Sequence, residues 1–152
     1  MSNFEQVKDV LKHQEELHGR IRDLYADLVN TASSERMRML LNLLCEHEEK
    51  FQQSINAHLE QASEAVLDTY FQFSHETSVE ELFDMGQVDA SINADDIEKI
   101  STRFSDYLDG LYQDLLNVAE SAEVKALFEN MREQQQQERK KLSTDLYSLL
   151  DM

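Results

Sequence analysis

The chain has 152 residues, of which 41% are hydrophobic and 30% are charged, and this length fits one domain with a buried core. Its 31 Asp and Glu against 14 Lys and Arg give a formal net charge of -17. This charge repels the phosphates of nucleic acid and the anionic face of a membrane, so we expect neither as a partner. The single Cys excludes an internal disulfide and is typical of the reducing cytoplasm, where we expect the protein.

Four long stretches with the helical spacing of apolar residues account for most of the chain. They span about residues 4–30, 34–62, 94–120 and 122–149, and the absence of proline favours helix in each. The turns at Ser34 and Ser121 are short, so each pair of helices is predicted to form an antiparallel hairpin. We predict an all-α fold, a single domain over residues 1–152, in which two hairpins form an antiparallel four-helix bundle.

A long crossover at residues 63–93 joins the two predicted hairpins, and it is long enough to return along a whole helix. Residues 69–73 alternate like an extended segment, and residues 78–81 have the pattern of a capping box ahead of a short helix. The apolar side chains of the crossover are expected to cover one edge of the bundle or to form a dimer face. They include Tyr70, Phe71, Phe73, Val79, Leu82, Phe83 and Met85.

The two predicted hairpins resemble each other in sequence. Moving the chain by 87 positions aligns Tyr25 with Tyr112 and Ser34 with Ser121. The capping residues and the apolar positions come into step together, which favours a repeated hairpin.

Polar residues interrupt the apolar side of each predicted helix near its middle. They are His18 on the first helix, Glu48 on the second, Ser105 on the third, and Gln135 and Glu138 on the fourth. Because antiparallel pairing brings the middles of helices together, we expect the five to form one polar layer in the core. A carboxylate buried alone is too costly to keep charged, so Glu48 and Glu138 require a cation, a shared proton or hydrogen-bond donors.

A small rotation of the second helix would change this layer. In one register Glu48 and Phe51 face inward, and His47 is expected at the surface or an edge. In the other, His47 or Lys50 faces inward, and Lys50 forms a salt bridge with Glu138. The apolar pattern of this helix is compatible with both registers.

The helical part of the chain resembles the rubrerythrin-type members of the ferritin-like superfamily. Residues 112–138 (YQDLLNVAESAEVKALFENMREQQQQE) resemble the second hairpin of that family closely, and residues 25–51 (YADLVNTASSERMRMLLNLLCEHEEKF) resemble the first more loosely. Family members bind two irons through one Glu from each of two helices and a Glu-x-x-His motif from each of the other two. The resemblance implies a ferritin-like bundle, and because such bundles commonly associate, we expect a homodimer.

The ligand positions that the resemblance implies hold mostly other residues in this chain. His18 and Ser105 stand at the two single-Glu positions, Glu48 and Phe51 stand for one Glu-x-x-His, and Gln135 and Glu138 for the other. This set has too little negative charge for two irons, so we expect no cofactor and a non-enzymatic role as a structural or protein-interaction module. The alternative is a metal-binding protein or oxidoreductase in which His18, Glu48 and Glu138 hold one Fe, Mn or Zn ion.

Overall fold

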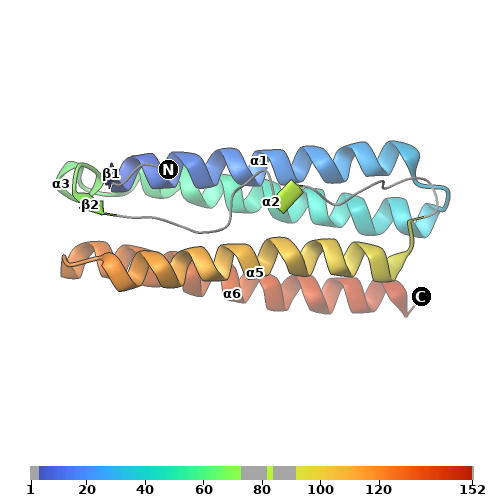
Figure 1. The fold of residues 1–152 in the computed structure, drawn as a ribbon. Coiled ribbons are helices and arrows are strands. Elements are labelled where there is room, and N and C mark those ends of the chain that lie inside the picture. The colour runs from blue at the N-terminus through green and yellow to red at the C-terminus, as the bar shows by residue number, and fades with distance from the viewer. Residues whose placement is uncertain (1–3, 73–81, 84–91, 152) are drawn as a thin grey trace.

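The structure is a computed structural model that describes residues 4–72, 82–83 and 92–151. Within these residues, four long helices make up most of the molecule: α1 (Val7–Thr31), α2 (Glu35–Gln61), α5 (Ala94–Val118) and α6 (Ala122–Leu150). A short helix, α3 (Glu64–Leu67), and two strands, β1 (Phe4–Gln6) and β2 (Tyr70–Gln72), lie together at one end (Figure 1). The all-α prediction is therefore confirmed.

The long helices lie along a common axis, with the α1–α2 hairpin beside the α5–α6 hairpin (Figure 1). The helices of each hairpin are antiparallel, whereas α2 and α5 run in the same direction. α2 ends near α3, and α5 begins at the opposite end of the molecule. The chain between β2 and α5 must therefore travel the length of the bundle, and most of this connection lies outside the described residues. Of the helices that the structure describes, none offers an apolar stretch of membrane-spanning length.

The first long helix begins later than the sequence predicts. We expected helix from about residue 4, but residues 4–6 form β1, which pairs antiparallel with β2 so that Gln6 lies opposite Tyr70. Gln6 has an extended backbone and forms a capping box with Asp9, so the helix begins at Val7. The extended segment predicted at residues 69–73 is confirmed by β2 in its described part.

The helix boundaries repeat at the spacing seen in the sequence. α1 and α5 each have 25 residues, and each residue of α1 stands 87 positions before its counterpart in α5. Ser34 and Ser121, which are counterparts at the same spacing, are the N-caps of α2 and α6, and each side chain accepts a backbone hydrogen bond. Gln6 and Asn93, also counterparts, both form capping boxes. Residues at this spacing can therefore be compared between the hairpins.

Buried apolar side chains fill the space between the helices in two clusters. One cluster includes Ile21, Tyr25, Leu41, Phe104 and Leu108, and the other includes Val10, Leu11, Tyr112, Leu115 and Phe128. Both clusters contain residues from both hairpins, so the burial of apolar surface stabilises the bundle as a unit.

The described part of the crossover covers one edge of this core. Leu82 is buried in the first cluster, and the rings of Phe83 and Phe104 pack with their centroids 5.3 Å apart. Tyr70, in contrast, is 69% exposed. The other residues named for this role, Phe73, Val79 and Met85, lie outside the described residues, as does the side chain of Phe71.

Candidate functional site

The interior of the bundle contains buried polar side chains, three of them from the predicted layer. His18, Glu48 and Gln135 are buried, whereas Ser105 and Glu138 are half-buried. Gln14 and His47 are also buried, although we did not place them in the layer. Gln14 lies one turn before His18 on the same side of α1, so helical spacing alone could have identified it.

His18 and Glu48 form a hydrogen-bonded pair that joins α1 to α2. His18 Nδ1 lies 2.5 Å from Glu48 Oε2, and the two side chains are 1% and 11% exposed. Phe51, nearly one turn after Glu48, stacks on the His18 imidazole with ring centroids 5.0 Å apart. Because water has little access to this pair, the hydrogen bond between the two side chains replaces one that each would otherwise form with water.

The structure of α2 combines features of the two registers that its sequence allows. Glu48 and Phe51 contact His18, and Lys50 is exposed, so the register that turns Lys50 inward toward Glu138 is wrong. His47 is nevertheless buried, as the other register predicted, which corrects our expectation that it lies at the surface or an edge. The reason is that α2 contacts both α1 and α6. Consecutive residues point about 100° apart around a helix of 3.6 residues per turn, so Glu48 faces one neighbour and His47 the other.

His47 lies between two carboxylates of α6. Its Nδ1 is 3.2 Å from Glu138 Oε2, and its Nε2 is 3.5 Å from Asp145 Oδ2. The imidazole is 2% exposed, but the carboxylate side chains are 31% and 39% exposed. The contact between His47 Nδ1 and Glu138 Oε2 does not have hydrogen-bond geometry. This contact is therefore looser than the one between His18 and Glu48.

Two buried amides are incompletely satisfied. Gln14 Oε1 accepts a hydrogen bond from the Tyr112 hydroxyl at 3.5 Å, which connects α1 to α5. Among the residues that the structure describes, neither Gln14 Nε2 nor Gln135 Oε1 has a hydrogen-bond partner. An unsatisfied buried donor or acceptor costs about 1–3 kcal/mol, so each amide lowers stability unless water reaches it.

Burial also changes the acidity of core side chains. It raises the pKa of Tyr112, and it raises the pKa of Tyr25 well above the usual value, where the charge of Glu48 adds to the effect. Burial and the nearby Glu49 raise the pKa of the Cys45 thiol to about 11. These groups are therefore protonated at neutral pH, and Cys45 lacks the thiolate that a nucleophile needs.

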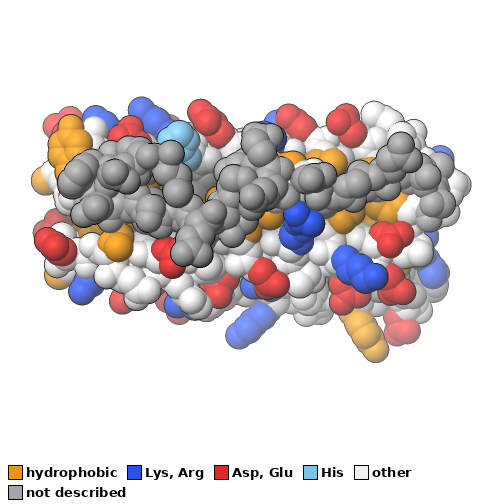
Figure 2. Space-filling view, in the orientation of Figure 1, with side chains coloured by type: hydrophobic (Ala, Val, Ile, Leu, Met, Phe, Trp, Pro, Cys, Tyr) orange, Lys and Arg blue, Asp and Glu red, His pale blue; other side chains and the backbone are white. Residues whose placement is uncertain are grey.

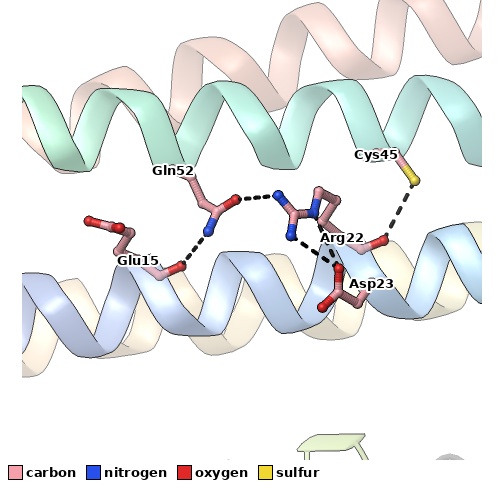
Figure 3. Close-up of polar contacts among 5 residues, drawn as sticks. All are labelled: Glu15, Arg22, Asp23, Cys45 and Gln52. Carbon is pink, nitrogen blue, oxygen red and sulfur yellow. Dashed lines mark hydrogen bonds and ion pairs between the residues drawn. The ribbon is translucent and has the colours of Figure 1, made fainter.

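A network of hydrogen bonds on the first hairpin connects α1 to α2 (Figure 3). Gln52 Nε2 donates a hydrogen bond to the backbone oxygen of Glu15 at 3.1 Å, and Arg22 donates to Gln52 Oε1 at 3.0 Å. A Cβ atom added to Gly19 would lie 2.8 Å from Gln52 Nε2. Gly19 thus leaves the space in which the Gln52 side chain lies against α1.

These groups do not match the metal sites that the resemblance suggests. His18 contacts Glu48, whereas Glu138 contacts His47. The three candidate ligands, His18, Glu48 and Glu138, therefore belong to two separate pairs. Across residues 4–72, 82–83 and 92–151, no three His, Cys, Asp or Glu side chains gather as they would around a metal ion. A two-iron centre does not fit, because Phe51 and Ser105 stand at ligand positions and leave too little charge.

Comparisons with known proteins identify no relative of this chain. It matches no family model, no curated protein and no solved structure. The ferritin-like resemblance therefore remains a prediction from residues 25–51 and 112–138.

Proposed function

We propose that this protein is a non-enzymatic structural or protein-interaction module on a ferritin-like bundle whose di-iron site has been lost. The main support is the His18–Glu48 pair, which stands at two of the ligand positions that the resemblance implies. The two side chains are hydrogen-bonded at 2.5 Å, and Phe51, at a third such position, stacks on His18. Groups that satisfy one another in this way maintain a bundle without a metal.

The burial of His18 and His47 supports a non-enzymatic role. A general acid or base must reach within hydrogen-bond distance of its substrate. The side chains of His18 and His47 are 1% and 2% exposed, so a substrate does not reach either imidazole in this structure. The high pKa of Cys45 also disfavours nucleophilic chemistry at the thiol.

The surface charge indicates what kind of protein partner the module would bind. The chain has a formal net charge of -17, and Asp and Glu side chains are spread over the visible face (Figure 2). A surface of this kind favours association with a basic protein surface and speeds their encounter. We also propose a homodimer, which light scattering on the purified protein would measure as twice the mass of the 17.7 kDa chain.

Metal loading tests this proposal. The protein is purified without chelator, incubated separately with Fe(II), Mn(II) and Zn(II), desalted, and analysed for metal content. We expect far less than one ion per chain for each metal. One ion per chain that Glu48→Ala abolishes, and that Glu49→Ala at the exposed neighbouring position retains, would overturn the proposal. That result would favour a mononuclear site at His18, Glu48 and Glu138.

A further inference from the structure

A cleft of about 430 Å³ opens along the second hairpin, between α5 and α6. Its volume lies in the range of small-molecule sites, about 300–1,000 Å³. Ile97, Leu142 and Leu146 supply apolar lining, Ser101 and Ser105 supply hydroxyls, and Arg139 supplies a cation. The lining is therefore amphipathic.

Small side chains on α5 leave the space for this cleft. Ser101 and Ser105 stand 87 positions after Gln14 and His18, which are large and buried in the first hairpin. The α1–α2 pair is also packed more closely than the α5–α6 pair. Replacing large inward side chains by serine removes volume, and the wider spacing of the helices keeps this space open.

The cation and the apolar residues lie at different ends of the cleft. Arg139 Nη2 is 3.9 Å from Asp106 Oδ1, so Arg139 and the adjacent Ser105 share one end. Because α5 and α6 are antiparallel, Ala94 and Tyr147 mark the other end. Eight residues separate Arg139 from Tyr147, which corresponds to about 12 Å along the helix at 1.5 Å per residue.

We propose that this cleft binds a medium-chain carboxylate, such as an unbranched fatty acid. Its carboxylate lies at Arg139, and its hydrocarbon chain lies over Leu142 and Leu146. A guanidinium binds a carboxylate through two parallel hydrogen bonds, and the 3.9 Å contact with Asp106 is too long to be a hydrogen bond. The carboxylate of Glu98, which also lines the cleft, repels the ligand head from the Ala94 end and favours this orientation.

The dimensions of the cleft favour a small ligand over a protein segment. Its volume of about 430 Å³ is that of a site for a small molecule. The net charge of -17 repels anions in general, so a bound carboxylate depends on the local cation at Arg139. This proposal uses none of the buried histidine pairs, so it stands or fails independently of the metal-loading result.

Calorimetric titration with decanoate below its micelle concentration tests the proposal. We expect saturable binding of one decanoate per chain, and Arg139→Gln should weaken it at least tenfold. Arg132→Gln is the matched control, because Arg132 is on the same helix but pairs with Asp109 at 3.1 Å outside the cleft, and it should retain binding. Decanol, which lacks the carboxylate, should bind more weakly than decanoate and should be insensitive to Arg139→Gln.

A second variant tests the cleft volume. Ser105→Leu fills the space beside Arg139 without changing the charge and should also abolish decanoate binding, while circular dichroism confirms that the variant is folded. If Ser105→Leu does not fold, Arg139→Lys provides a second test of the cation instead, because it retains the charge, and it should bind more tightly than Arg139→Gln. The proposal is overturned if decanoate does not bind saturably. It is also overturned if Arg139→Gln binds as well as the unaltered protein.

Discussion

The helices of the two hairpins begin at equivalent positions, but the helix pairs pack at different spacing. In the first hairpin, Gly19 leaves room for Gln52 of α2, whose side chain forms hydrogen bonds with Glu15 and Arg22 of α1. The counterparts 87 positions later are Asp106 and Arg139, which are 3.9 Å apart beside an open cleft. The capping positions that repeat between the hairpins therefore set where the helices begin. The inward side chains at equivalent positions differ, and they set how closely the helices approach.

The interiors of the hairpins differ in the same way. His18 and Glu48 form a hydrogen bond at 2.5 Å, whereas their counterparts are Ser105, half-buried at the cleft, and Gln135. Gln135 is 5% exposed, and its Oε1 has no partner among the described residues. The first hairpin thus has a satisfied polar pair where the second has an unsatisfied amide. Substitutions at these equivalent positions should change stability in opposite directions.

Glu48→Ala should have the largest effect. It leaves His18 buried without its partner, and breaking a buried pair in this way costs about 3 kcal/mol. Urea unfolding measures the free energy of unfolding. Glu49→Ala, at an exposed position one residue away, should change it by less than about 0.5 kcal/mol. If Glu48→Ala lowers stability no more than this control, the pair does not stabilise the first hairpin.

Replacing both partners sharpens the same test. His18→Leu combined with Glu48→Leu removes the unsatisfied group together with the pair and keeps apolar volume beside Phe51. We expect the double variant to be close to the unaltered protein in stability, because apolar replacement of a buried pair is often neutral or stabilising. A double variant as unstable as Glu48→Ala would show that the pair itself is structurally required.

Gln135→Met should stabilise the protein, in contrast to Glu48→Ala. Methionine keeps a similar volume and removes the unsatisfied Oε1, so the free energy of unfolding should rise by about 1 kcal/mol. Gln136→Met, at the exposed neighbouring position, should have little effect. A loss of stability in Gln135→Met would mean that the amide is hydrogen-bonded in solution, for example to a buried water.

Local features of the fold were predictable from the sequence. The N-caps Ser34, Asn93 and Ser121 act within one turn, so the sequence places the helix starts correctly. The strand β1 was missed because it depends on pairing with residues 70–72, far along the chain. Helical spacing identified His18 and Glu48 as inward residues, and the structure buries both.

Features that depend on how several helices pack against one another were not predictable from the sequence in the same way. The sequence left His47 undecided between two registers because an apolar pattern describes one helix face, and α2 contacts both α1 and α6. The cleft at Ser105 was missed because it arises from a difference in spacing between helix pairs, which sequence periodicity does not contain. The ferritin-like relationship and the loss of the metal site remain predictions.

The smallest predicted effect is a loss of stability at alkaline pH, to which one tyrosine of each hairpin contributes. Tyr25 and Tyr112 are counterparts, and burial raises the pKa of both phenols above the usual value of about 10. The folded protein therefore holds these protons more tightly than the unfolded chain. The stability that this provides is complete below about pH 10 and falls as the pH rises further.

Tyr25→Phe and Tyr112→Phe should separate the two contributions. Each variant should lose less stability than the unaltered protein between about pH 8 and pH 11, because phenylalanine does not ionise. The protection should be nearly equal for the two variants, because burial keeps both phenols protonated in the folded protein over this range and the loss comes from ionisation in the unfolded chain. Urea unfolding measures the free energy of unfolding of each variant at both pH values. Comparing each variant with its own value at the lower pH cancels the effect of losing the Tyr112–Gln14 hydrogen bond. A variant that gives no protection would show that the phenol it replaces ionises as readily in the folded protein as in the unfolded chain, so that burial does not hold its proton.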